Sequence, residues 1–186
     1  MDDLRNLINL VEAKGKPDLV LEKLPYGRGS LSPVLSQSTV DYHYGQLAKG
    51  YVDRFNKGEG DKDFNEAGAF LHNILFPILM PPKTGNKPTG ASASLINSKY
   101  GNFEKFKEAV KTEALKLIGS GWIYMSRNGD IKTIRNHQIK NDIALLIDMW
   151  EHAYNRDYGA NKAKYLDSIW RIINWERVNI RIYAGK

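Results

Sequence analysis

A proline- and glycine-rich stretch, PPKTGNKPTG (residues 81–90), constrains the fold of this chain more than any other feature. Its composition excludes a helix or a strand, so it separates the segments on either side. Before it, apolar residues recur at helical spacing, and after it, helical patterns alternate with short β-prone runs. We therefore expect an N-terminal extension (1–23), a helical hairpin domain (24–88) and an α/β C-terminal domain (89–186). At 186 residues the chain is long enough for a well-packed core.

The segment before this boundary predicts two antiparallel helices, preceded by a short amphipathic helix at residues 3–13. Ser36 is a plausible N-cap for a long helix through Asn56. The apolar face of that helix consists of Val40, His43, Leu47, Tyr51 and Phe55. After the turn NKGEGDKD, a second helix runs from about Phe64 until the prolines that begin at Pro77. One side of it carries Gly68, His72 and Leu75. Because the turn is short, the two helices should form a hairpin.

The segment after the boundary mixes helices with a small sheet. Helical patterns cover residues 95–99 and 103–118. Two β-prone runs then flank Asn128-Gly129, a dipeptide typical of hairpin turns. The apolar run IALLI indicates a buried strand that ends at Asp148, and helices follow in KAKYLDSIWRIINWERV. The expected fold class is α+β, with an N-terminal antiparallel helical hairpin followed by an α/β domain that holds a small sheet of about three antiparallel strands.

Composition narrows the range of functions. A hydrophobic content of 42% with 26% charged residues is typical of globular proteins. Cysteine is absent, which excludes disulfides and thiolate metal sites and fits a reducing compartment, so we expect a cytoplasmic protein. The N-terminus opens acidic and no apolar run reaches membrane-spanning length, so neither a secretory signal nor a membrane association is expected. The formal charge is +6, but lysines and arginines are scattered among acids, so nucleic-acid binding is disfavoured.

The chain has four histidines, and each can be weighed separately. His43 and His72 lie on apolar faces, one on each arm of the expected hairpin. One histidine in such a place is more often a core residue, but two that face each other across a hairpin shift the balance away from that reading. A buried imidazole needs either a hydrogen-bond partner or a metal. Asp148 and His152 add a carboxylate and a third imidazole from a strand end and the following turn. This nitrogen and oxygen set suits iron, manganese or zinc, and the lack of sulfur disfavours copper(I) and iron–sulfur clusters.

Several motifs around these residues occur together. The stretches DMWEHAYNRDY, FNEAGAFLH, VDYHYGQLAKGYV and GSGW resemble the iron/manganese superoxide dismutase family, in the family's order. The resemblance runs from LPY, which starts at Leu24, to INWERV near the C-terminus, and WEHAY with GSGW and INWE is specific as a set. It implies an enzyme that converts superoxide to O2 and H2O2 by one-electron cycling of one iron or manganese ion in each subunit.

The resemblance also implies roles for individual residues. The family's four metal ligands are matched by His43, His72, Asp148 and His152. Tyr51 stands where the family has its gateway tyrosine, whose hydroxyl takes part in proton supply. Trp150 would form an apolar wall that excludes water beside the metal. Phe64 and Trp122 match the aromatic lining of the pocket. Glu151 matches the residue that reaches across a two-fold interface to the partner's histidine ligand, which implies a homodimer or a tetramer.

A fifth position concerns the solvent molecule bound to the metal. Manganese-type members usually contact it with a glutamine after the β-hairpin, and iron-type members with a glutamine from the second helix. Here His137 follows the hairpin and Gly68 occupies the helix position. His137 would then replace the glutamine and direct its other nitrogen toward Tyr51 or water. Gln138, the next residue, is the alternative. The pattern leaves iron and manganese open, with a lean to iron.

Other positions depart from the family pattern. Leu47 and Ala48 stand where paired histidines are usual, and Asn155 replaces the second tyrosine of HAYY. That tyrosine and the first of those histidines meet across the dimer at the mouth of the substrate funnel. Lys162 replaces an arginine near the funnel, which keeps the charge but not bidentate binding. The departures leave an alternative, a metal-binding structural or partner-binding relative with little dismutase activity, against which the intact ligand set and Tyr51 argue.

Overall fold

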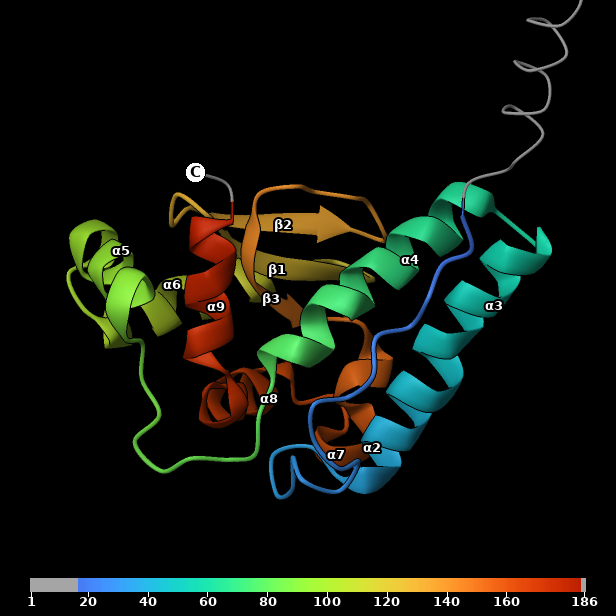
Figure 1. Cartoon of the computed structure of the whole chain (residues 1–186). Helices are drawn as coiled ribbons and strands as arrows, with labels where there is room; N and C mark the ends of the chain where they lie inside the picture. The colour runs from blue at the N-terminus through green and yellow to red at the C-terminus, as the bar shows by residue number, and fades with distance from the viewer. Residues whose placement is uncertain (1–16, 185–186) are drawn as a thin grey trace, which may run out of the picture.

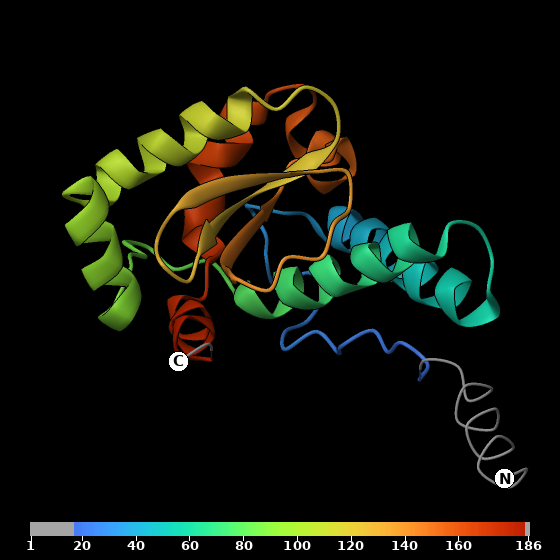
Figure 2. The ribbon, with the colours of Figure 1, turned by 90° about the horizontal axis from the view of Figure 1, so that it is seen from above.

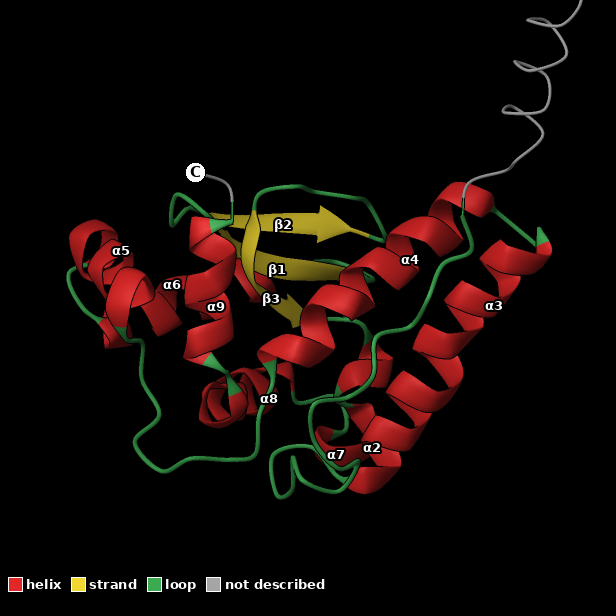
Figure 3. Cartoon of the chain, viewed as in Figure 1, coloured by secondary structure: helices red, strands yellow, loops and turns green. Residues whose placement is uncertain are grey.

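The computed structural model describes residues 17–184. It consists of a helical hairpin that lies beside a second part made of a small sheet and its covering helices (Figure 1). All strands of the described residues belong to the second part, as the colours of Figure 3 show. The expected α+β class, with a helical hairpin followed by an α/β domain, is confirmed.

The first arm of the hairpin is continuous but not uniform. It is made of α2 (Gln37–Tyr42), a π-helical segment (His43–Ala48) and α3 (Lys49–Lys57). Ser36 is its N-cap as expected, because the Ser36 hydroxyl accepts the N–H of Thr39 at 3.2 Å. The second arm, α4 (Lys62–Leu75), runs antiparallel to α3 and continues into a 3-10 turn (Phe76–Ile78).

The π-helical segment changes which residues face the core. The expected apolar face placed Leu47 beside His43, four residues on, as in a regular α-helix. A π turn holds more residues than an α turn, so the buried position moves on by one. Ala48 is therefore fully buried and Leu47 only partly, whereas Tyr51 and Phe55 remain in the core. The prediction was wrong for Leu47 alone.

An extended segment, residues 17–26, runs along the hairpin (Figure 1). Asn56 of α3 binds its backbone twice, because Oδ1 accepts the N–H of Leu19 at 2.8 Å and Nδ2 donates to the carbonyl of Leu19 at 2.9 Å. Asn73 of α4 binds two residues of the segment, because its Oδ1 accepts the N–H of Glu22 at 2.9 Å and its Nδ2 donates to the carbonyl of Val20 at 2.8 Å. Leu19 and Leu21 pack against a small cluster formed by Tyr51, Val52 and Ala69. The helix expected at residues 3–13 lies outside the described residues.

The second part contains the sheet. Helices α5 (Gly90–Tyr100) and α6 (Phe103–Leu115) precede it. The antiparallel sheet has the order β2-β1-β3 and is made of β1 (Gly121–Ser126), β2 (Ile131–Arg135) and β3 (Ile143–Asp148). The predicted hairpin at Asn128-Gly129 and the buried strand ending at Asp148 are both confirmed. The chain ends with α7 (Asn155–Tyr158), α8 (Lys162–Ser168) and α9 (Trp175–Tyr183).

Two helix boundaries differ from the sequence expectation. Helix α5 starts at Gly90 rather than at residue 95, because Asn179 of α9 caps it. The Asn179 carbonyl oxygen accepts the N–H of Ser92 at 2.8 Å, and its amide donates to the carbonyl of Thr89 at 2.9 Å. Helix α6 ends at Leu115 rather than at residue 118. Beyond Leu115 the chain leaves the helix and turns at Gly119, which has a positive φ.

The core lies between the sheet and the helices on both of its sides. Helices α4 and α9 pack against β3, and α6 packs against β1 and β2, so that α4 and α6 lie on opposite sides of the sheet (Figure 2). Every residue of β1 and β3 is buried, as expected for strands covered on both faces. A bridge between Leu79 and Ile173 ties the end of the hairpin to the segment before α9. In the described part of the chain, no helix combines the length and apolar character needed to cross a membrane.

Candidate metal centre

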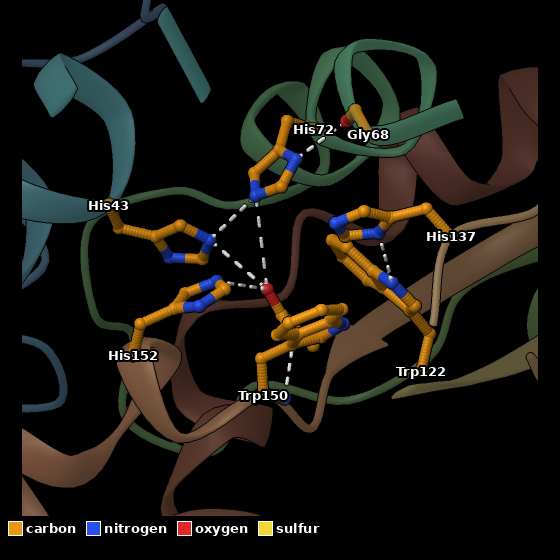
Figure 4. Close-up of polar contacts among 8 residues, drawn as sticks. His43, Gly68, His72, Trp122, His137, Trp150 and His152 are labelled. Carbon is orange, nitrogen blue, oxygen red and sulfur yellow. Dashed lines mark hydrogen bonds and ion pairs between the residues drawn. The ribbon is translucent and has the colours of Figure 1, made fainter. Parts of the chain in front are cut away.

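Four side chains from distant parts of the chain meet between the hairpin and the sheet (Figure 4). His43 begins the π-helical segment, His72 lies in the last turn of α4, and Asp148 ends β3. His152 lies in a 3-10 turn (Glu151–Ala153) that follows β3. One donor atom of each lies within 4.8 Å of all the others. Within residues 17–184, no second group of three or more His, Cys, Asp or Glu side chains gathers in this way.

The donor atoms face a common centre. Oδ2 of Asp148 lies 3.1 Å from Nε2 of His43, 3.2 Å from Nε2 of His152 and 4.0 Å from Nε2 of His72. The Nε2 atoms of His43 and His72 are only 3.0 Å apart. Three of the four residues are buried, and His152 is partly exposed.

The carboxylate of Asp148 is held anionic. Burial by itself raises the pKa of this carboxyl, but the imidazoles of His152 and His43 beside it outweigh burial and hold the pKa well below its usual range. Its second oxygen, Oδ1, accepts the backbone N–H of Trp150 at 2.8 Å, which fixes the rotation of the carboxylate and leaves Oδ2 toward the histidines. A fully buried anion of this kind requires cationic partners.

Two histidines of the cluster, His43 and His72, are held neutral. Burial lowers the pKa of His43, although its hydrogen bond to Asp148 acts in the opposite direction. Burial also lowers the pKa of His72, and neighbouring His43 lowers it further. The Nδ1–H of His72 donates to the carbonyl of Gly68 at 2.6 Å, which leaves the Nε2 lone pair of His72 free to bind a metal.

The donor set therefore fits an iron, manganese or zinc ion. Three imidazole nitrogens and one carboxylate oxygen converge, and cysteine sulfur is absent. In the described residues, the negative charge of Asp148 has no lysine or arginine among its ion-pair partners. These are borderline and hard ligands of the kind that iron, manganese and zinc accept. A cation at the centre would satisfy both the buried carboxylate and the nitrogen lone pairs that face one another.

His137 lies beside the four ligands (Figure 4). Its ring stacks on Trp150, with centroids 4.6 Å apart, and its Nδ1 accepts the indole N–H of Trp122 at 3.2 Å. The expectation that the second nitrogen faces Tyr51 or water is therefore wrong. Burial lowers the pKa of His137 to about 4, so at neutral pH the ring carries one proton, on Nε2. That Nε2 is buried, has no hydrogen-bond partner among residues 17–184, and faces the cluster. Gln138, the alternative, is exposed.

Tyr51 closes another side of this space. Its ring centroid lies 5.4 Å from that of His72 and 4.9 Å from that of His137. The ring packs against the backbone of Gly68 so closely that a Cβ there would lie 2.8 Å from Tyr51 Cγ. Burial, together with the charge of Asp148, raises the pKa of Tyr51 to about 12, with Arg54 acting in the opposite direction. Tyr51 therefore keeps its proton at neutral pH.

The remaining residues singled out in the sequence occupy different environments. Phe64 lies 4.6 Å from His137, ring to ring, and 6.3 Å from Trp150, so it belongs to the aromatic lining. Glu151 and Asn155 are exposed, and Lys162 is partly exposed. The hydrogen bond from His72 to the carbonyl of Gly68 was not predicted from the sequence. The position of Gly68, four residues before His72 on the same helix, could have indicated it.

The comparisons with known proteins agree with this geometry. A family model described as iron/manganese superoxide dismutases, alpha-hairpin domain, matches residues 18–70, and the corresponding C-terminal domain model matches residues 88–181. An iron superoxide dismutase of Bacteroides fragilis is 32% identical over 189 residues, covering 87% of this chain and 98% of the relative. A superoxide dismutase of Porphyromonas gingivalis named for both manganese and iron is 35% identical, covering 87% and 97%. The iron superoxide dismutase of Escherichia coli K12 is 31% identical, covering 85% and 95%.

Proposed function

The chain belongs to the iron/manganese superoxide dismutase family, and from this premise we infer that it is an enzyme that converts superoxide to O2 and H2O2. We propose that the reaction takes place at the cluster of His43, His72, Asp148 and His152. The observation that carries this proposal is the convergence of four donor atoms, three imidazole nitrogens and one carboxylate oxygen, within 4.8 Å of one another.

The cofactor is one iron or manganese ion per subunit, and we propose that these four residues hold it. When bound there, the ion supplies the one-electron oxidation and reduction by which two superoxide ions and two protons become O2 and H2O2. Asp148 would contribute one negative charge, and the three imidazoles would each contribute a nitrogen lone pair. The family relatives are named for iron, for manganese or for both. Gly68 and His137 match neither metal-specific pattern, so they leave both metals open; we propose iron, with manganese as the alternative.

Residues around the cluster would hold protons where the reaction needs them. His137 keeps its Nε2–H and, because Trp122 occupies its Nδ1, has a single donor to offer toward the cluster. Tyr51 remains protonated at neutral pH, and its ring lies 4.9 Å from that of His137, centroid to centroid. We propose that both act as hydrogen-bond donors to a solvent or substrate oxygen, while Phe64, Trp122 and Trp150 exclude bulk water from the space.

We also propose an assembly, a division into domains and a cellular location for the protein. Glu151, exposed in the single chain, would reach His152 of a second copy across a two-fold axis, which makes the protein a homodimer or a tetramer. The chain would divide into an N-terminal extension (1–23), the helical hairpin domain (24–88) and the C-terminal domain (89–186). We also propose a cytoplasmic location, in line with the absence of cysteine.

Metal analysis and a dismutase assay of the same samples test the proposed function. Iron-loaded and manganese-loaded proteins are prepared, and the rate of superoxide decay is measured against metal content. We expect the rate to rise in proportion to bound metal in at least one of the two series, and we expect His72→Ala to be largely metal-free and inactive. A fully loaded wild-type protein that leaves superoxide decay at the uncatalysed rate would favour the metal-binding structural relative instead.

A further inference from the structure

Arg54 contacts the tyrosine of the site. The guanidinium carbon of Arg54 lies over the ring of Tyr51, 5.0 Å from its centroid, in cation–π geometry. Arg54 is in the last turn of α3, three residues after Tyr51, so both side chains lie on the same side of the helix. Nothing in the sequence motifs singled out this residue.

The position of Arg54 is fixed by a neighbour on the other arm of the hairpin. Its Nε–H donates to Oδ1 of Asn65 at 3.0 Å, and Asn65 is 2% exposed. The Asn65 amide in turn donates to the carbonyl of Glu59 at 3.0 Å. Gly50 leaves room for the guanidinium, since a Cβ there would lie 3.0 Å from Arg54 Nη1. The arginine is therefore held over Tyr51 by contacts with both arms.

The charge of Arg54 is not neutralised by a local acid. Its one side-chain hydrogen bond within the described residues is to the neutral amide of Asn65, and no carboxylate of that part of the chain forms an ion pair with it. This differs from Arg28, the other arginine of the hairpin domain that lies over a tyrosine. Arg28 lies 5.7 Å from the Tyr44 ring centroid but forms a 3.0 Å ion pair with Asp41.

The charge is close enough to act on an anion at the site. The guanidinium carbon of Arg54 lies 5.0 Å from the Tyr51 ring centroid, which lies 5.4 Å from the His72 ring centroid, so the charge is at most about 10 Å from the ring of His72. This distance is about the Debye length at 0.1 M ionic strength, so the attraction is present but sensitive to salt. Superoxide is a small anion, and positive charge beside a site raises its rate of arrival.

We propose that Arg54, fixed by Asn65 over Tyr51, is a positioning and steering residue of the reaction: it holds the Tyr51 ring in place and attracts superoxide to that side of the site. The inference rests on the proposed dismutase function. The size of the effect follows from one unit charge at this distance in a largely aqueous surrounding, which changes the local concentration of a monovalent anion by about two- to fourfold.

The test compares Arg54→Gln, Arg54→Lys and Arg28→Gln in the metal-loaded protein. For Arg54→Gln we expect kcat/KM at low ionic strength to fall by about two- to fourfold, and its dependence on salt to become flatter. Arg54→Lys should recover most of the salt dependence, because it restores the charge. Arg28→Gln removes the same charge and the same kind of stacked pair from the same domain, and it should leave both quantities near wild type.

A second readout does not depend on turnover. The affinity of azide, a small anion that is not a substrate, is followed through the absorbance of the bound metal, and it should weaken by a similar factor in Arg54→Gln only. Metal content and melting temperature are measured for every variant. Should Arg54→Gln fail to fold, Arg54→Met, which keeps the aliphatic stem over Tyr51, takes its place in the comparison.

The outcomes separate this inference from the proposed function. Wild-type protein without dismutase activity contradicts the proposed function, and the azide measurement then still decides whether Arg54 attracts anions. Active wild-type protein with Arg54→Gln matching Arg28→Gln in rate, salt dependence and azide affinity overturns the inference alone. Failure of Arg54→Lys to recover the salt dependence contradicts the steering role.

Discussion

At the scale of single residues, the site depends on which ring nitrogen carries a proton. Gly68 takes the Nδ1–H of His72 and so directs the Nε2 lone pair of His72 into the cluster. Trp122 does the reverse for His137, because it donates to Nδ1 and leaves the proton on Nε2. One histidine is thus prepared as a ligand and the other as a donor, although both are buried and close together, with ring centroids 6.0 Å apart.

This difference predicts separate effects of substitution. His137→Ala should retain wild-type metal content, since the residue is outside the ligand cluster, yet lose dismutase activity by about ten- to a hundredfold. The exposed neighbour offers a matched control, and Gln138→Ala should behave as wild type. Metal analysis and superoxide decay rates of the same preparations check both statements. Wild-type activity in His137→Ala would rule out the donor role.

The buried histidines also predict a pH dependence of the metal-free protein. Burial lowers the pKa values of His43, His72 and His137 below the ordinary value of 6.5, in the last case to about 4. At a pH between the folded-state pKa values and 6.5, the unfolded chain binds more protons than the folded one. The free energy of unfolding must therefore fall as the pH drops from about 6.5 toward 4. Asp148, whose pKa is lowered, acts in the same direction at still lower pH.

Urea unfolding of the metal-free protein at pH 7.5, 5.5 and 4.5 measures this dependence. We expect the midpoint to move steadily to lower urea concentration with decreasing pH. A midpoint that stays constant or rises between pH 7.5 and 4.5 would show that these histidines are not buried in neutral form.

At the scale of elements, the extended segment at residues 17–26 depends on side chains that replace a partner strand. Asn56 bonds both polar groups of the Leu19 backbone, in the way a neighbouring strand would. Asn56→Ala should therefore lower the free energy of unfolding by about 1 kcal/mol, or the melting temperature by about 2–4 °C. Thermal unfolding checks this against Asn97→Ala, an exposed position on α5. Equal melting temperatures for the two variants would refute it.

Most elements could be predicted because their signals are local. Ser36 caps the first helix through its own hydroxyl, and Asn128-Gly129 closes a hairpin by its own backbone preference. The start of α5 could not be predicted, because its cap is Asn179, a residue on another helix. The register change at Leu47 and Ala48 also has no local signal, since a π turn is not distinguished by residue types that favour an α-helix.

The candidate site divides in the same way. The residue types and spacing of His43, His72, Asp148 and His152 were visible in the sequence, and the structure brings them together. The partner of His137 was not visible, because Trp122 and His137 come close only through the pairing of β1 with β2 and the turn that follows. The contact of Arg54 with Tyr51 could not be predicted either, because it depends on the hydrogen bond from Arg54 to Asn65 on the opposite arm.

At the scale of the whole molecule, the proposed assembly involves the exposed carboxylate of Glu151. If Glu151 bonds His152 of a second copy, Glu151→Ala should raise the dimer dissociation constant by at least about tenfold and weaken metal retention. Glu108→Ala, which removes an exposed acid from α6, should change neither. Sedimentation at several concentrations measures the association. A wild-type protein that is monomeric at micromolar concentration would contradict the assembly.

The central claim is that the reaction takes place at a metal ion held by His43, His72, Asp148 and His152. Anomalous diffraction from crystals of the active, metal-loaded protein, recorded at the iron and manganese absorption edges, tests it most directly. The account predicts one anomalous peak per subunit, bounded by the Nε2 atoms of the three histidines and Oδ2 of Asp148. An active protein whose anomalous peak lies elsewhere, or that shows no peak at either edge, would contradict it.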